Sequence, residues 1–325
     1  MTIKILNAII AIVGGVAGAM IFYWLLNMLV QRLPSRWEHR IKPFVFVGPA
    51  LLVIGLFLIY PAARTVLLSF ANARSTEFVG FANYVDLLGS AQFRLVLVNT
   101  LLWIVVVPTF VVLFGLMVAV LTDRLGTRGE KTVKSLIFLP MAISMVGAST
   151  IWGFIYTSRP AGQAQIGVLN AVVVRFGGDP VPWLQISTAK LNSFLLMVIL
   201  IWIQTGFAMV LLSSAIKAVP EETLEAARID GASEAQTFFR VVVPQIWPTV
   251  ITVFITVLIT VMKIFDIVYV TTNGNFDTGV VAQFFFTELF TNGNNGRAAA
   301  IVVILMIAII PVMVYQVRHF RKQEA

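Results

Sequence analysis

The residues best suited to a specific contact are Glu225, Ala226 and Ala227, with Gly231 four positions beyond. Small side chains at 226 and 227 allow another protein to approach the backbone closely, and the Glu225 carboxylate can add a charge-assisted hydrogen bond. Arg228 lies three residues after Glu225, so the two side chains can pair along one helix. The chemistry that these residue types favour is docking to another protein rather than catalysis.

The flanking residues predict two short helices that would position these side chains. Pro220 suits the first position of a helix, and the two glutamates that follow complement the dipole of its first turn. Gly231 can adopt the left-handed conformation that ends a helix. Ser233 and Gln236 have capping-box spacing, which predicts a second helix that runs to a pause at Pro244.

Composition restricts the function classes. The 325-residue chain is 59% hydrophobic and only 12% charged, with a mean hydropathy of +0.92. A soluble fold of this size cannot bury so much apolar surface. The net charge of +8 is spread between apolar stretches, which excludes a soluble enzyme and a nucleic-acid binder. Because the chain has no cysteine, disulfides and thiolate metal sites are excluded as well.

No site for energy-consuming chemistry is expected in the chain. A P-loop requires the pattern GxxxxGK[ST], and its nearest approach, residues 126–132, has the wrong spacing and predicts a plain inner loop. The sequence also lacks the clusters of acidic, histidine or serine residues that hydrolysis requires. We therefore expect no enzyme, no cofactor and no metal, and any energy must come from a partner.

Seven stretches of twenty or more residues lack a charge and predict membrane-spanning helices. About 20 apolar residues cross the hydrocarbon core as a helix, and backbone groups in lipid must bond internally. The sequence therefore predicts an all-α integral membrane protein with about seven spans. The predicted spans are residues 5–30, 43–63, 95–122, 135–158, 191–216, 241–262 and 298–317.

The basic residues predict the orientation of these spans. One set of alternate connections holds 14 Lys and Arg, and the other set holds 7. The richer set is expected in the cytoplasm, which places the N-terminus outside. The chain then divides into an N-terminal helix with a cytoplasmic linker (1–42), a membrane domain (43–318) and a cytoplasmic tail (319–325). Within a long outer connection, residues 166–176 predict a short interfacial helix.

The stretch that begins at Glu225 and ends with Val241-x-Val243-Pro244 resembles the EAA loop of ABC importer permeases. That loop has the pattern Glu-Ala-Ala, three residues, Gly, nine residues, Ile-x-Leu-Pro. Residues 225–233 look like the carbohydrate-uptake branch, and residues 284–290 and 311–320 look most like the alpha-glucoside permeases. Other matching motifs are Tyr60-Pro61, Ser69-Phe70, Phe265-Asp266 and Thr272-Asn273-Gly274.

The resemblance implies a multi-pass permease of the cell inner membrane, with a six-helix core and an extra N-terminal helix. It implies a second permease subunit, a cytoplasmic ATPase dimer and a periplasmic or lipid-anchored sugar-binding protein as partners, besides membrane lipid. The loop 219–244 would couple to the ATPase through Glu225, Ala226, Ala227, Asp230 and Gly231. The implied substrate is an alpha-glucoside such as maltose, sucrose or trehalose.

Two alternatives remain open at this point. A permease for another small solute, such as glycerol phosphate, would have the same loop. A seven-helix receptor or retinal protein would fit seven spans with an outside N-terminus, but retinal requires a lysine in the last span, and residues 298–317 contain none.

Gln204 and Phe207 are candidates for the substrate pathway. Gln204 is an uncharged polar residue in the middle of the fifth predicted span, and Phe207 lies three residues on, on the same helix face. A sugar requires hydrogen bonds from such amides and an aromatic face on which to stack. The alternative is that Gln204 forms an interhelical hydrogen bond. The matching sixth-span positions are polar in the maltose permeases, but here they are Val257, Val261 and Ile264.

Lys263 and Asp266 form a second candidate pair, three residues apart at the predicted outer end of the sixth span. Charges at membrane depth are expensive, and they tend to pair or to line pathways. We expect a structural ion pair with Lys263 extended toward the interface, or else sugar contact, gating or docking.

Overall fold

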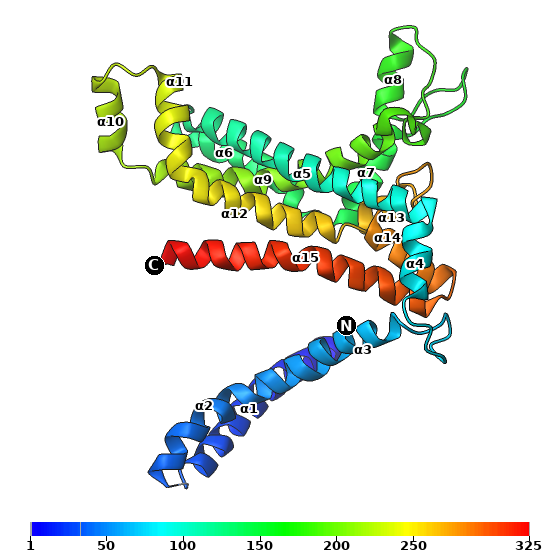
Figure 1. Ribbon diagram of the computed structural model, residues 1–325. Helices are drawn as coiled ribbons and strands as arrows, with labels where there is room; N and C mark the ends of the chain where they lie inside the picture. The colour runs from blue at the N-terminus through cyan, green and yellow to red at the C-terminus, as the bar shows by residue number, and fades with distance from the viewer. Residues whose placement is uncertain (1, 33, 325) are drawn as a thin grey trace. The chain divides into compact units, whose positions relative to one another are not determined.

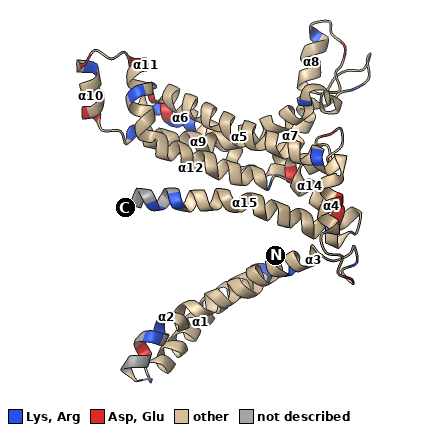
Figure 2. Cartoon of the chain, in the orientation of Figure 1, with Lys and Arg blue, Asp and Glu red and all other residues tan. Residues whose placement is uncertain are grey.

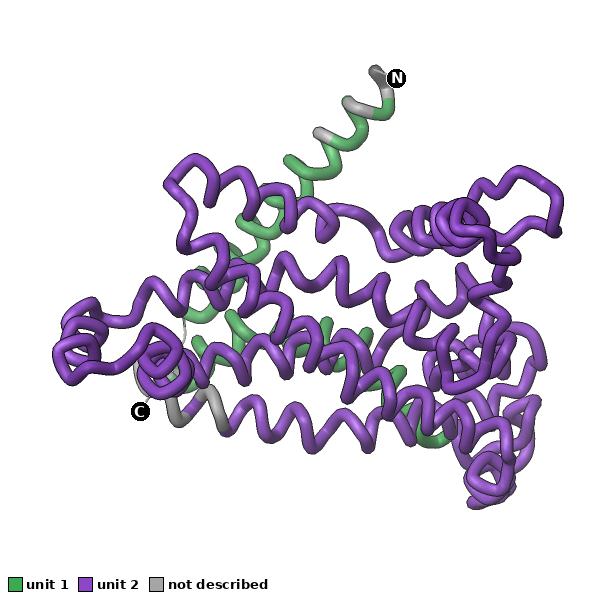
Figure 3. The backbone as a smooth tube through the Cα atoms, turned by 90° about the horizontal axis from the view of Figure 1, so that it is seen from above, with its two compact units in different colours: residues 1–67 green, residues 68–325 purple. Residues whose placement is uncertain are grey.

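The computed structural model describes residues 2–32 and 34–324, and the chain divides into two compact units, residues 1–67 and 68–325 (Figure 3). The boundary predicted at residue 42, between the N-terminal helix with its linker and the membrane domain, stays a prediction. The helices are α1 (Thr2–Val30), α2 (Ser35–Ile54), α3 (Tyr60–Leu68), α4 (Ala82–Gly89), α5 (Ala91–Asp123), α6 (Thr127–Phe138), α7 (Met145–Tyr156), α8 (Val168–Arg175), α9 (Leu191–Lys217), α10 (Glu221–Ile229), α11 (Glu234–Thr237), α12 (Val243–Met262), α13 (Asp266–Thr271), α14 (Val281–Phe286) and α15 (Asn295–Glu324) (Figure 1).

The prediction of about seven membrane-spanning helices is confirmed. Six helical segments of the described chain are long and apolar enough to cross a membrane, and a bent pair makes up to seven. The charged side chains gather at the helix ends and in the connections, and the helix middles are largely free of them (Figure 2). The short helix predicted within residues 166–176 is present as α8, and its position at the membrane interface stays a prediction.

The fourth predicted span differs from the expectation because it is not one straight helix. Its two parts, Thr127–Ala142 and Met145–Tyr156, meet at 102°. The cause is local: the chain becomes extended at Ile143 and Ser144, and the Ser144 hydroxyl accepts a hydrogen bond from the Gly147 amide at 3.1 Å, which starts a new helix. Residues 127–132, expected as a plain loop, form the first turns of α6.

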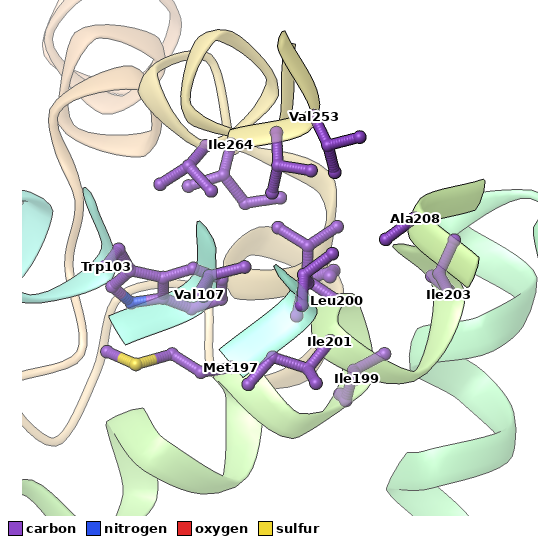
Figure 4. Close-up of a cluster of buried hydrophobic side chains, with 14 of the residues drawn as sticks. Trp103, Val107, Met197, Ile199, Leu200, Ile201, Ile203, Ala208, Val253 and Ile264 are labelled. Carbon is purple, nitrogen blue, oxygen red and sulfur yellow. The ribbon is translucent and has the colours of Figure 1, made fainter. Parts of the chain in front are cut away.

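The core of the second unit lies where α5, α9 and α12 pack together. Fully buried side chains from all three helices meet there, including Trp103, Leu200 and Val253 (Figure 4). The helices approach closely because small residues face each other: a Cβ atom added at Gly115 of α5 would lie 2.5 Å from Cβ of Ala208 of α9. Such small-residue contacts bring helix backbones together in membranes.

We expect Gly115→Ala to destabilise the bundle, since the added methyl group forces α5 and α9 apart. Overpacking of this kind costs about 1–3 kcal/mol, which should lower the melting temperature of the purified protein in detergent. Gly153→Ala is the matched control, because nothing lies within 4 Å of a Cβ added there. Equal melting temperatures for the two variants would contradict the close contact.

The orientation of the spans is open to a direct test. Reporter fusions after Tyr84 and Asn273 should report the outside, and fusions after Arg128 and Ser233 should report the cytoplasm. The reason is the excess of basic residues in the connections that contain Arg128 and Ser233. A single reversed reporter among the four would refute the seven-span topology.

Candidate functional site

The loop between α9 and α12 contains the two predicted helices, α10 and α11. Helix α10 ends as expected: Gly231 has φ +80°, the amide of Gly231 donates to the carbonyl of Arg228, and the amide of Ala232 donates to the carbonyl of Ala227, both at 3.0 Å. This pair of bonds is the Schellman motif. Ser233 and Gln236 form the predicted capping box at the start of α11.

The two faces of α10 differ in exposure. Leu224 and Ala227 are half-buried, and Leu224 packs against the edge of the bundle core. The opposite face is fully exposed and carries Glu222, Glu225, Ala226 and Ile229 at the spacing of one helical stripe. The structure thus places Ala226 and Ala227 on different faces, although their residue types predict the same role.

Ile229 is the residue on α10 that the sequence analysis missed. Its side chain is 85% exposed, and no residue of α10 is buried. An isolated helix of nine residues is marginal in water, and this one projects from the end of the bundle beside α11 (Figure 1). An apolar side chain, a small residue and acids on one exposed stripe form a surface suited to a protein partner.

Helix α11 continues into the sixth span without the predicted pause at Pro244. A π-helical turn at Phe238–Val242 joins α11 to α12, so residues Glu234–Met262 form one continuous helical span. The π turn accommodates Pro244, which has no amide hydrogen to donate. The α10–α11 turn is therefore joined to α12 by unbroken helix.

The ion pairs near this loop also differ from expectation. Arg228 pairs with Glu234 (Nε–Oε1 3.5 Å) rather than with Glu225. At the neighbouring ends of α6 and α9, the Glu130 carboxylate accepts hydrogen bonds from Lys134 and Lys217, both at 2.5 Å. Glu130 thus ties α6 to α9 just before the loop that contains α10 and α11, a link between residues 87 positions apart that spacing could not reveal.

Gln204 and Phe207 both lie half-buried on α9. Among the residues that the structure describes, none forms a hydrogen bond with the side-chain amide of Gln204, so the alternative of an interhelical bond is not observed within the described chain. Gly206, between them, brings α9 against the end of α6, where a Cβ atom would lie 2.6 Å from the carbonyl oxygen of Ile137. The apolar side chains Val257 and Val261 of α12, and Ile264 just after its end, are buried in the core.

The predicted ion pair between Lys263 and Asp266 is not formed. Helix α12 ends at Met262 and α13 starts at Asp266, with Lys263 exposed and Asp266 half-buried. The break between the two helices separates the side chains, and within the described chain neither has an ion-pair partner within 4 Å. Sugar contact, gating and docking stay open for both residues.

An apolar cavity of about 640 Å³ lies beside α5, α6, α7 and α9. Its walls include Phe110, Phe114, Trp152 and Trp202 and almost no polar atoms. A sugar needs several hydrogen-bond partners, and these side chains offer none besides the indole N–H groups of the two tryptophans. Neither Gln204 nor Phe207, the candidate pathway residues of α9, lines this cavity.

Comparison with known proteins identifies this arrangement. Residues 88–324 match the family described as binding-protein-dependent transport system inner membrane component. The chain belongs to this family. The permease is therefore a multi-pass protein of the inner membrane and not an enzyme.

Relatives and solved structures agree along nearly the whole permease. It is 43% identical to the alpha-glucoside transport system permease protein AglF of Rhizobium meliloti, over 98% of each chain. It is 48% identical to the osmoprotective compounds uptake permease protein GgtC of Synechocystis, over 86% of this chain and 99% of that one. A bacterial ABC transporter that imports alginate shares the fold, with a TM-score of 0.74 at 21% identity over 88% of this chain and 99% of that one.

Proposed function

We propose that this permease moves an alpha-glucoside such as maltose, sucrose or trehalose into the cell. A separate ATPase dimer supplies the energy, a second permease subunit completes the pathway, and a periplasmic or lipid-anchored protein delivers the sugar. The observation that carries the substrate class is the 43% identity over 98% of both chains with an alpha-glucoside permease. The membrane domain would comprise residues 43–318, with the loop 219–244 as its contact with the ATPase.

The exposed stripe of α10 supports the coupling role. Glu225 and Ala226 would contact the ATPase directly, with Ile229 as an apolar anchor, while Ala227 holds the helix against the bundle. Asp230 and Gly231 would shape the turn that leads into α11. Because α11 and α12 are continuous, motion of the ATPase would be transmitted to the sixth span.

Gln204 and Phe207 are the residues we propose for sugar contact within the spans. An amide without a hydrogen bond from the described residues retains its full capacity for a sugar hydroxyl. Lys263 and Asp266 are secondary candidates, since both lie at the junction between α12 and α13 without an ion-pair partner among the described residues.

Uptake of labelled sugars by a strain that lacks the chain, with and without the gene restored, tests this proposal. We expect restored uptake of at least one of maltose, sucrose and trehalose, and none of glycerol phosphate. The assay should also be run after osmotic upshift, because GgtC is a permease for osmoprotective compounds. Restored uptake of glycerol phosphate alone would replace the alpha-glucoside assignment.

A further inference from the structure

A polar pocket of about 290 Å³ lies at the predicted outer end of the second unit, and we call it the outer pocket. Its walls come from the start of α5, the loop between α13 and α14, and α14 with the π-helical turn that follows it (Thr287–Thr291). Polar atoms make up most of its lining, in contrast to the apolar cavity beside α9.

Buried amides from other helices hold the loop that forms one wall. The Asn99 side chain of α5 donates to the carbonyls of Asp277 and Gly279, at 2.7 and 2.8 Å. The Asn192 side chain of α9 donates to the carbonyl of Phe276 at 2.7 Å. Asn99 and Asn192 are fully buried, so the loop is fixed to the bundle by bonds that solvent does not weaken. The wall is preorganised.

Gln283 forms the floor of the outer pocket and is only 5% exposed. Its amide nitrogen donates to the carbonyl of Asn273 (3.1 Å) and to the hydroxyl of Thr287 (3.0 Å). Its carbonyl oxygen accepts no hydrogen bond from the described residues. Gly274, at φ +76°, leaves room for this oxygen, because a Cβ atom there would lie 2.4 Å from it. An acceptor without a partner on a buried side chain can bind a donor from a ligand.

The remaining groups define the chemistry of a ligand. Gln92, Asp277 and Thr291 are among the lining residues, and their side chains make no hydrogen bonds within the described chain, so they are free to bond hydroxyl groups. Leu95 and Phe284 add an apolar wall. No Lys or Arg among the described residues lines the pocket, and the Asp277 carboxylate disfavours an anion.

We propose that the outer pocket binds one ring of a neutral, polyhydroxylated solute before it enters the spans. Its volume is at the lower end of small-molecule pockets, which suits a single sugar ring and not a longer chain. The pocket is separate from Gln204 and Phe207, neither of which lines it. This inference rests on the proposed sugar uptake and assigns the outer pocket as an entry subsite.

The absence of cysteine from the chain permits a site-specific test. Thr291→Cys places one thiol in the pocket, and Thr188→Cys is the control, an exposed threonine outside its lining. Both variants, in the complete transporter in membrane vesicles, are labelled from outside with a membrane-impermeant maleimide. We expect trehalose, sucrose or maltose to slow labelling of this chain in the first variant only, and glucose 6-phosphate to slow it in neither.

A second substitution measures the contribution of a single pocket amide. Gln92→Leu, added to Thr291→Cys, should raise the half-protecting sugar concentration about two- to twelvefold, the effect of one lost hydrogen bond. Gln185→Leu is the matched control and should leave the half-protecting sugar concentration unchanged. If the unmodified transporter takes up sugar but no sugar protects the thiol, the outer pocket is overturned and the proposed function stands. If no sugar is taken up at all, the proposed function itself has failed.

Discussion

Gly231→Pro should abolish sugar-stimulated ATP hydrolysis while the protein still inserts in the membrane. Proline requires φ near −65°, whereas Gly231 has φ +80°, and its amide donates to the carbonyl of Arg228 at 3.0 Å. The substitution costs about 3 kcal/mol or more, which lowers the equilibrium constant for the native turn more than about a hundredfold. Gly231→Ala adopts the left-handed conformation with less strain, so its defect should be much smaller.

Glu225→Lys tests the exposed face of α10 by reversing the charge of one side chain. Glu225 is exposed and within the described chain has no ion-pair partner, so its replacement should not affect folding. If the carboxylate meets a positive group on the ATPase, charge reversal should weaken docking at least about thirtyfold. Asp179→Lys, at an exposed acid on the predicted outer side, is the control. Normal coupling in both Glu225→Lys and Gly231→Pro would refute the docking role of α10.

Gln204→Leu is the second change with a large expected effect. Leucine retains similar bulk and removes only the polarity. If a sugar hydroxyl bonds the Gln204 amide, the loss leaves that hydroxyl unpaired in a dry environment and costs about 1–3 kcal/mol. Uptake should then fall about 5- to 150-fold, or shift its sugar preference. Phe207 shares the helix face, so Phe207→Ala should weaken uptake of the same sugars.

The readouts for Gln204→Leu separate pathway contact from packing. A pathway residue should change uptake and leave basal ATP hydrolysis, yield and melting temperature intact. A packing residue should lower yield or melting temperature. Gln185→Leu makes the same chemical change at an exposed residue and should behave like the unmodified protein. Normal uptake at every sugar concentration would remove Gln204 from the pathway.

The two helices of the loop 219–244 were predictable because their signals are local. Gly231 ends α10 and Ser233 starts α11 through bonds to residues no more than five positions away. The spans were predictable because about twenty apolar residues without a charge are long enough to cross the hydrocarbon core as a helix. The bend in the fourth span was not predicted because an apolar stretch shows only that a segment can cross the membrane, and not whether its helix is straight. Ser144, four residues after Pro140, is a helix-cap signal that could have indicated the bend.

The outer pocket could not be predicted from spacing. Asn99 bonds to residues 178 and 180 positions away, and only the folded bundle brings α5 to the loop after α13. The exposure of Ile229 was hidden for the same reason, since an isoleucine on a short helix is normally buried. The unpaired state of Lys263 depends on where α12 ends, and the boundaries of elements are the least predictable feature of a sequence.

Uptake of a labelled alpha-glucoside into proteoliposomes tests the central claim most directly. The vesicles should hold the complete transporter with ATP inside, and the sugar-binding protein should be added outside. We predict accumulation that requires ATP, the binding protein and this chain together. Accumulation without ATP, or equal accumulation after this chain is left out of the complex, would contradict an ATP-coupled permease.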